Sequence, residues 1–275
     1  MVNNSFTIFG KGFVGTSFSN FLIKKKLKFF FPKKGKYKFK KNLNHIVYCI
    51  GNQNWLKYPE KTFEANLAMV GKIIFNNKFR SFTLVSSTRV YFANTKNKTG
   101  EGEFIKIKSD NKDFLYNSLK IAAENLCLSL NNKNIKVARI SNLFGNNFTN
   151  QSYILPTWIK DSINKKKINL FINKNSTKDY IFVDDAFEIL LKIIKKSKFR
   201  LYNIASGRNV KLSKILKEIK KNTNCKIRYK NNSKIIKEPK ININRIKKEF
   251  NFKVKNNLID SISQLIIDYK KKFKK

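Results

Sequence analysis

Short apolar runs alternate with stretches of helical periodicity along the first half of the chain. The first run covers residues 5–9, and Phe13, Phe18 and Leu22 then recur at helical spacing. Further strands are predicted at 27–31, 45–50, 81–86 and 135–140, and helices at 59–76 and 113–130. Strands and helices that alternate at these lengths are typical of a parallel sheet with helices on both faces.

The pattern is less regular after about residue 148, where Asn-rich loops separate the apolar stretches. The predicted elements there are a helix at 155–164, strands at 179–183 and 200–205, and helices at 211–221 and 256–272. We therefore expect an α/β protein with a Rossmann-type, doubly wound parallel sheet and a small C-terminal α/β lobe for the substrate. Residues 1–148, completed by about 181–206, would form the first domain, and 149–180 with 207–275 the lobe. Ligands of such sheets bind at the carboxyl edge of the strands.

The charge is strongly basic, with 59 Lys and Arg against 17 Asp and Glu, a formal net charge of +42. Most of this charge is Lys, and it is spread over the whole chain. Asn, Ile and Phe are also abundant. These three residues and Lys all have A/T-rich codons, so a biased genome explains the composition. Sequence-specific nucleic-acid recognition favours the planar guanidinium of Arg, which can form two parallel hydrogen bonds, and Arg is scarce in this chain. We therefore expect no specific nucleic-acid partner.

Histidine and cysteine are scarce. The single histidine excludes His-based triads and most zinc chemistry, and the three cysteines have no metal-binding spacing. An acid–base catalyst must then be Tyr, Lys, Asp, Glu or Cys. No apolar run approaches the ~20 residues of a membrane helix. The first residues lack the basic, apolar and small-residue regions of a signal peptide. These features predict a cytoplasmic protein without membrane insertion.

A glycine-rich loop follows the first predicted strand. Gly10, Gly12 and Gly15 form G-x-G-x-x-G between a strand and a helix. The first glycine permits a tight turn, the second a close approach to a pyrophosphate, and the third close packing of helix and strand. The loop predicts dinucleotide binding, the alternative being a glycine-rich turn that binds nothing.

The end of the second predicted strand bears on the choice of cofactor. NAD-type sites usually carry an acidic residue about 20 residues after the loop. This chain has Lys33 and Lys34 there and no Asp or Glu. A lysine pair could hold a 2′-phosphate, which favours NADP(H) over NAD(H). Alternatively, both lysines are simply solvated.

Tyr116 and Lys120 lie four residues apart in a predicted helix, on one face and one turn apart. A nearby ammonium lowers the pKa of a phenol from about 10 toward neutral pH. The phenol could then exchange a proton with a carbinol during hydride transfer. Such a pair also arises by chance in a lysine-rich chain, so the spacing alone leaves a surface role open.

Together these motifs resemble the extended short-chain dehydrogenase/reductases, the NAD-dependent epimerase/dehydratase family of nucleotide-sugar enzymes. The resemblance runs nearly from end to end. In chain order its motifs are GKGFVG, VYCIG, FEANLAMVGK, SSTRVY, YNSLKIAAE, ARISNLFG, KDYIFVDDA and LYNIASG.

The resemblance implies a role for each matching residue. Ser87 would hydrogen-bond the substrate oxygen, Tyr116 would be the acid/base, and Lys120 would bind the nicotinamide ribose. Besides Tyr116 and Lys120, the implied cofactor contacts are Gly10, Gly12, Phe13, Val14, Gly15, Cys49, Ile50, Gly51, Asn66 and Ser141. The implied substrate contacts are Ser87, Thr88, Asn142 and Lys178.

Three departures from the family pattern bear on function. The glycine loop is one residue shorter than the common form, and the segment between residues 31 and 45 is short, so we expect the third strand and its helix to be trimmed. The 4,6-dehydratases carry an acid directly after the catalytic hydroxyl residue, where this chain has Thr88 and Arg89. The resemblance therefore disfavours dehydration.

The expected function is an NAD(P)-dependent nucleotide-sugar oxidoreductase, either a 4-ketoreductase or an epimerase, with NADPH-dependent reduction preferred. The alternatives are an idle NAD(P)-binding scaffold with a basic surface and a reductase of a small carbonyl compound. The family also implies a homodimer that pairs helices 59–76 and 113–130 in a four-helix bundle; internal packing of the same faces is equally compatible. The candidate dimer residues are Phe63, Leu67, Val70, Ile74, Leu126 and Leu130.

Overall fold

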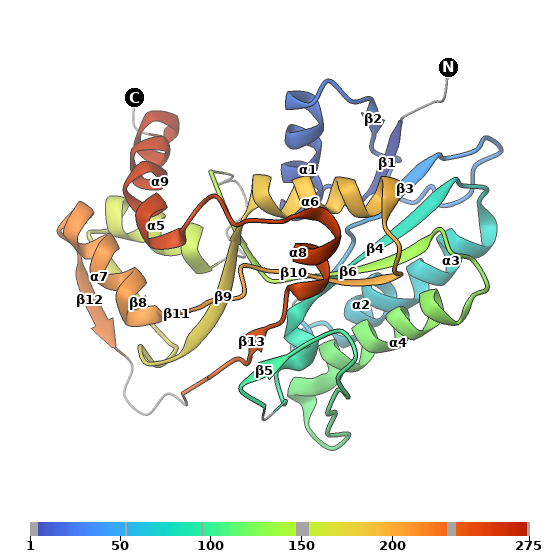
Figure 1. Ribbon diagram of the computed structural model, residues 1–275. Coiled ribbons are helices and arrows are strands. Elements are labelled where there is room, and N and C mark those ends of the chain that lie inside the picture. Colours follow the sequence, from blue (N-terminus) through green and yellow to red (C-terminus); the bar gives the residue numbers. More distant parts are fainter. Residues whose placement is uncertain (1–4, 53, 95, 147–153, 230–234, 274–275) are drawn as a thin grey trace.

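The computed structural model describes residues 5–273 except 53, 95, 147–153 and 230–234. A six-stranded sheet with the order β10-β6-β4-β3-β1-β2 forms the centre, and every neighbouring pair is parallel (Figure 1). Its strands are β1 Phe6–Phe9, β2 Phe29–Phe30, β3 His45–Tyr48, β4 Ser81–Ser87, β6 Ile135–Ile140 and β10 Leu201–Ile204. Burial of β1, β3 and β6 along their whole length explains why most of their side chains are apolar.

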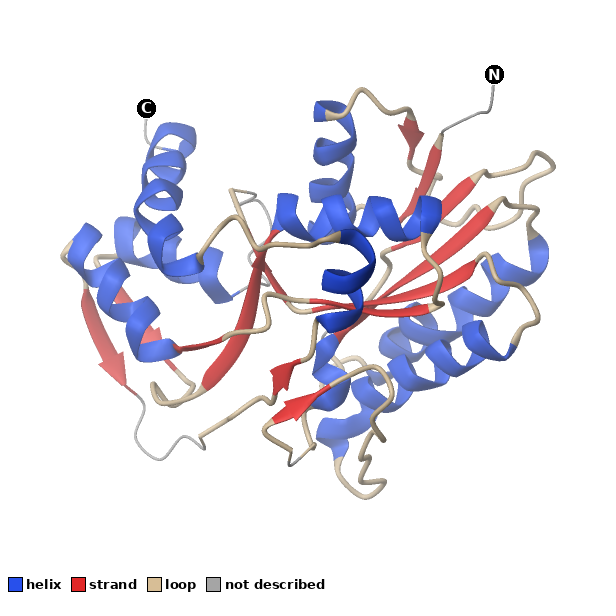
Figure 2. Cartoon of the chain, in the orientation of Figure 1, coloured by secondary structure: helices blue, strands red, loops and turns tan. Residues whose placement is uncertain are grey.

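Helices cover both faces of the sheet (Figure 2). Helices α1 (Phe13–Lys24) and α6 (Val183–Lys196) pack together on one face. The other face carries α4 (Leu115–Ser129) and the predicted helix 59–76. That helix has three parts, α2 Pro59–Phe63, the π-helical segment η1 Glu64–Ala68 and α3 Met69–Asn76. The predicted Rossmann-type architecture is confirmed, although the sequence analysis did not single out α6.

The sheet ends at β2. Residues 31–44 contain neither a strand nor a helix, so the third strand and helix expected of a longer relative are missing here. The switch point, where the strand order reverses, lies between the neighbouring strands β1 and β3. The carboxyl ends of these strands therefore face the same edge, where ligands of open α/β sheets bind.

A second core lies beside that edge (Figure 1). It is built by helices α5 Ile154–Asn164, α7 Leu212–Thr223 and α9 Leu258–Phe273 and by the parallel strands β8 Lys167–Leu170 and β12 Lys226–Tyr229. Each of the three helices has one apolar face, and Leu155, Leu216 and Ile262 are buried in this core. This core is the C-terminal lobe.

Two small sheets connect the lobe to the central sheet. Strand β9 (Thr177–Phe182) lies between β7 (Asn142–Phe144) and β11 (Asn209–Lys211). Strands β5 (Lys98–Thr99) and β13 (Lys240–Ile241) pair in parallel. The short helix α8 (Asn244–Phe250) follows β13, and side chains from 241 to 252 pack into the core of the large domain rather than the lobe. The boundary expected at residue 148 lies outside the described residues.

The faces proposed for dimer contact are only partly available. Val70 and Ile74 are buried in the core beneath α3, which leaves them no role in a partner contact. Phe63 and Phe75, in contrast, are about half or more exposed, at 49% and 64%. Among the described helices, none is long and apolar enough to cross a bilayer.

Candidate active site

The glycine loop joins the end of β1 to the start of α1. Gly10 has a φ of +108°, and a Cβ there would lie 2.7 Å from the backbone nitrogen of Ile50. A Cβ on Gly15 would lie 1.9 Å from the carbonyl oxygen of Gly10. Only glycine therefore fits these two positions. Gly12, by contrast, has no described neighbour within 4 Å of its Cβ position, so on the described part of the chain its backbone faces open space.

That open space is a cavity of about 720 Å³ at the carboxyl edge of the sheet, with the lobe on its other side. Both halves of the molecule contribute to its wall. The predicted site residues that line it are Gly12, Phe13, Val14, Cys49, Ile50, Gly51, Ser87, Thr88, Tyr116, Lys120, Ser141, Asn142 and Lys178.

Three other predicted residues lie beneath this wall. Gly10 and Gly15 pack against the backbone under the loop. Asn66, fully buried in η1, donates from Nδ2 to the carbonyl oxygens of Asn52 and Thr62 at 3.1 and 3.0 Å. Its Oδ1 has no hydrogen-bond donor among the described residues and lies 3.3 Å from the Cβ position of Gly51.

The two lysines expected to bind the 2′-phosphate of the cofactor do not line this cavity. Lys33 and Lys34 are exposed in the turn after β2, and neither lines the cavity. The structure thus does not bring them together with the other predicted site residues.

Tyr116 lies in the first turn of α4, buried against the cavity. Burial raises the pKa of its phenol to about 12, while the charge of Arg89 and a hydrogen bond with Ser87 act in the opposite direction. Ser87, at the end of β4, and Tyr116 therefore meet in space although 29 residues separate them. At neutral pH the phenol is protonated and can donate.

Lys120 follows one turn later on the same helix face. Its Nζ lies 5.8 Å from the centre of the Tyr116 ring and donates to the carbonyl oxygen of Val85 at 3.4 Å. Burial lowers the pKa of this lysine to about 8, and Glu124 and Cys49 oppose the shift. The ammonium therefore remains mostly protonated at neutral pH, beside the phenol.

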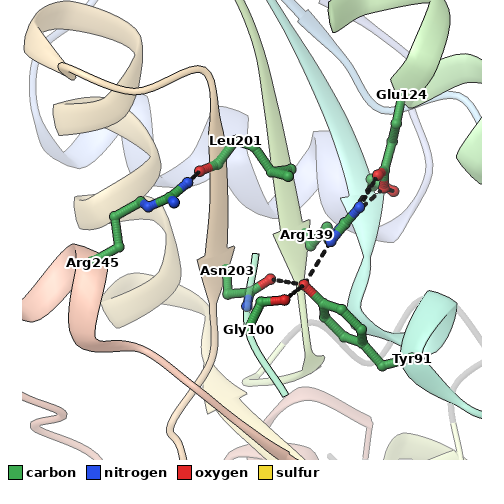
Figure 3. Close-up of polar contacts among 8 residues, drawn as sticks. Tyr91, Gly100, Glu124, Arg139, Leu201, Asn203 and Arg245 are labelled. Carbon is green, nitrogen blue, oxygen red and sulfur yellow. Dashed lines mark hydrogen bonds and ion pairs between the residues drawn. The ribbon is translucent and has the colours of Figure 1, made fainter. Parts of the chain in front are cut away.

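A buried ion pair holds this helix against the sheet (Figure 3). Glu124 of α4 accepts two hydrogen bonds from Nε of Arg139 on β6, at 3.1 and 2.9 Å, and one from its Nη2. Both side chains are nearly inaccessible, at 1% and 5% exposure. Ser86 of β4 donates to the same carboxylate. The pair thus fixes Lys120, one turn before Glu124, relative to Ser87, the residue after Ser86.

The same network continues to β10. Arg139 donates from Nη1 to the hydroxyl of Tyr91 at 2.6 Å, and Tyr91 contacts Oδ1 of Asn203 at 3.0 Å (Figure 3). Tyr91 belongs to the 3-10 turn η2 (Thr88–Tyr91), directly after Ser87. The charged members of this network, Glu124 and Arg139, were not predicted from the sequence. The pattern that could have indicated them is the spacing of Glu124, which lies four residues after Lys120 and therefore on the same helix face.

The lobe side of the cavity carries a second ion pair that the sequence analysis also missed. Nζ of Lys178 lies 3.6 Å from the carboxylate of Glu238, and both side chains are largely buried. Burial raises the pKa of Glu238, against the opposing charges of Lys178 and Arg89. Asn142 donates from Nδ2 to the carbonyl oxygen of Asp179 at 2.9 Å. Glu238 comes from a segment with no recognisable motif, so only the fold brings it to the site.

The residues present fit a nicotinamide dinucleotide. The cavity begins at an open glycine backbone at the start of a helix, as pyrophosphate binding requires. It continues to the ammonium of Lys120 and the phenol of Tyr116. Beneath its wall, Oδ1 of Asn66 is buried without a hydrogen-bond donor among the described residues. No group of three or more His, Cys, Asp or Glu side chains that could hold a metal is found among the described residues.

Comparisons with known proteins agree with this arrangement. A sequence profile of the NAD dependent epimerase/dehydratase family matches residues 37–205. No curated protein matches the sequence.

Solved structures match the fold over 98% of this chain. MoeE5 in complex with UDP-glucose and NAD is 13% identical, with a TM-score of 0.83 and 99% of its own chain covered. UDP-glucose 4-epimerase from Thermotoga maritima with UDP-glucose is 15% identical, with a TM-score of 0.82 and 100% covered. RMD from Pseudomonas aeruginosa with NADPH is 16% identical, with a TM-score of 0.80 and 99% covered. At these identities the likeness establishes the fold.

Proposed function

Because the chain belongs to the NAD-dependent epimerase/dehydratase family, we propose that it is an oxidoreductase of nucleotide sugars, acting at a sugar carbon as a 4-ketoreductase or an epimerase. One observation carries this proposal: Ser87, Tyr116 and Lys120, from a strand end and a helix, line one cavity with the glycine loop. Their positions match the family's catalytic hydroxyl, acid/base and ammonium.

The residues that would hold the cofactor line the cavity from one end to the other. Gly12, Phe13 and Val14 would bind the pyrophosphate at the start of α1. Gly51, with Asn66 beneath it, and Ser141 would surround the nicotinamide half. When bound, the dinucleotide supplies or accepts the hydride.

The protein's own task is to move a proton at the sugar oxygen. The hydroxyl of Ser87 holds this oxygen, and Oη of Tyr116 donates a proton to it or removes one from it. Lys120 stabilises the phenolate that forms when Tyr116 has given up its proton, because its ammonium lies one helix turn away. The buried Glu124–Arg139 pair keeps these groups in register.

Nucleotide-sugar binding is proposed for the lobe side of the cavity. Thr88, Asn142 and Lys178 line it there, and Lys178 supplies a positive charge for a diphosphate. MoeE5 and the Thermotoga maritima epimerase, whose folds match this chain, were solved with UDP-glucose.

Reduction with NADPH is the more specific proposal. The phenol of Tyr116, with its pKa raised to about 12, is a proton donor at neutral pH, which suits reduction of a ketone. Arg89 stands where dehydratases carry an acid, and Glu238 is engaged by Lys178. No acid follows β2 to repel a 2′-phosphate, although Lys33 and Lys34 lie outside the cavity wall.

The variant Tyr116→Phe tests the proposal. It should abolish turnover of 4-keto and 4-hydroxy sugar nucleotides while leaving dinucleotide affinity within about twofold, because only the proton donor is lost. A reductase would consume reduced cofactor in proportion to product; an epimerase would interconvert two sugars with no net change in cofactor absorbance. Unchanged turnover in Tyr116→Phe would contradict the proposed role of this residue.

Cofactor choice is tested separately by equilibrium binding of NADPH and NADH. We expect tighter binding of NADPH, and a weaker preference in the double variant Lys33→Ala, Lys34→Ala. The matched control is Lys36→Ala, another exposed lysine of the same turn. Equal binding of both cofactors would refute the NADP(H) preference and leave the nucleotide-sugar activity to be judged by Tyr116→Phe.

A further inference from the structure

Arg89 is a cation of the cavity wall that the proposed chemistry does not use. It lies two residues after Ser87, and its guanidinium carbon is 4.7 Å from the ring centre of Trp55 and 5.0 Å from that of Phe92. Trp55 also packs against Tyr116, with 5.5 Å between ring centres. The two aromatic rings hold the guanidinium in place, beside the site of proton transfer.

No carboxylate among the described residues forms an ion pair with this cation. Among the described residues that line the cavity, the cations are Lys120, Lys178 and Arg89, and the only carboxylate is Glu238, which pairs with Lys178. Nε of Arg89 is buried and has no acceptor among the described residues. Burial lowers the pKa of this guanidinium, against the opposing charge of Glu238. A partly desolvated charge that forms no ion pair is costly, so an anion bound in the cavity would stabilise it.

We propose, on the premise of the function above, that the substrate is a nucleotide sugar with a carboxylate on its hexose ring, and that Arg89 binds this carboxylate. A planar guanidinium matches a carboxylate with two parallel hydrogen bonds, and its fixed stacking on Trp55 favours such a fork. Ser87 and Tyr116 would contact the oxygen on the reacting sugar carbon. Because Arg89 lies beside them in the cavity wall, a ligand group that it binds would belong to the same sugar ring. The diphosphate is assigned to Lys178, on the lobe side.

Two other roles for Arg89 make different predictions. If it bound the diphosphate, its loss would weaken every nucleotide equally. If it served only to lower the pKa of Tyr116, its loss would change the pH dependence of turnover and leave ligand discrimination unchanged. Discrimination between a sugar acid and the matching neutral sugar therefore isolates the proposed role.

Trp55 provides the reporter for the test. The chain has two tryptophans, and the other, Trp158, is buried in the lobe core. In a Trp158→Phe background, Trp55 fluorescence reports what binds next to Arg89; calorimetry on the protein with both tryptophans provides a second measurement. UDP, dTDP, GDP and CDP are titrated first. The nucleotide that binds is then compared as its glucose ester and its glucuronate ester, in which the diphosphate is joined to C1 of the sugar and the glucuronate keeps its free carboxylate.

The glucuronate ester should bind at least about tenfold more tightly than the glucose ester, as expected for a charged bidentate contact. Arg89→Gln should abolish this ratio while leaving the affinity for the bare nucleoside diphosphate within about twofold, and Arg89→Lys should retain part of it. In the control, Lys178→Gln should weaken both esters and the diphosphate together.

Three results would overturn the inference: equal affinity for the two esters, a ratio that survives Arg89→Gln, or equal weakening of the bare diphosphate by that variant. If no nucleotide or nucleotide sugar binds at all, the proposed function itself fails. Binding of both esters without discrimination removes only the role of Arg89.

Discussion

Replacing Lys120 by methionine should stabilise the protein while removing its activity. The side chain is buried, and burial lowers the pKa of its ammonium from about 10.5 to about 8. A charge held at such a position destabilises the folded state. Glu124, which partly offsets this cost, keeps its own partner Arg139 when Lys120 is replaced.

The magnitude follows from linkage. A pKa lowered from 10.5 to about 8 corresponds to at most about 3 kcal/mol, at about 1.4 kcal/mol for each tenfold change in proton affinity. Because the folded-state pKa is the lower one, the unfolded chain binds more protons between about pH 8 and 10.5, and stability rises with pH across that window. The full penalty of Lys120 is therefore present at pH 7 and relieved above pH 10.5.

Denaturant unfolding of the apo protein between pH 7 and 10.5 measures this effect. The Lys120→Met variant should exceed the unmodified protein in unfolding free energy by up to about 3 kcal/mol at pH 7, and the difference should shrink toward zero at pH 10.5. Lys112→Met, at an exposed lysine just before α4, should differ by less than about 0.5 kcal/mol throughout. A Lys120→Met variant that is less stable at pH 7, or a difference that does not change with pH, would refute the reasoning.

Three further predictions concern folding and assembly. Arg139→Met should lower the unfolding free energy by about 3–5 kcal/mol, because Glu124 is left buried without its partner; a loss below about 1 kcal/mol in chemical denaturation would contradict this. Gly15→Ala should reduce both stability and dinucleotide affinity, since its Cβ would collide with the loop backbone, whereas Gly12→Ala should unfold normally and lose affinity alone; calorimetry with and without dinucleotide checks both. Light scattering should show a homodimer that Phe75→Glu, on the exposed face of α3, converts to monomers, and a monomeric unmodified protein would disprove the interface.

The sequence pattern was most informative where one face or both faces of an element are buried. Strands β1, β3 and β6 are buried along their length and mostly apolar because helices cover both sides of the sheet, and this gave their positions within one or two residues. Gly10 and Gly15 could be recognised because backbone geometry admits no other residue there. Tyr116 and Lys120 could be paired because helical spacing alone brings them together.

The parts that were missed depend on tertiary contacts. Arg89, Trp55 and Glu238 come from three segments of the chain, and no local periodicity shows that they reach one cavity. Two of the proposed dimer residues, Val70 and Ile74, have the spacing of a contact face, yet that face packs internally. Lys33 and Lys34 were chosen by their distance from the glycine loop; they lie outside the cavity wall, and their role in cofactor choice stays a prediction.

The central claim is that the phenol, the ammonium and the hydroxyl of the cavity surround the reacting end of a bound nicotinamide dinucleotide. A crystal structure of the protein with NADPH tests it most directly. We predict that the pyrophosphate lies on the backbone of Gly12 and that the nicotinamide ring lies within hydrogen-bonding reach of Tyr116 and Lys120. A dinucleotide bound outside this cavity, or one whose nicotinamide ring lies away from Tyr116, would contradict the account.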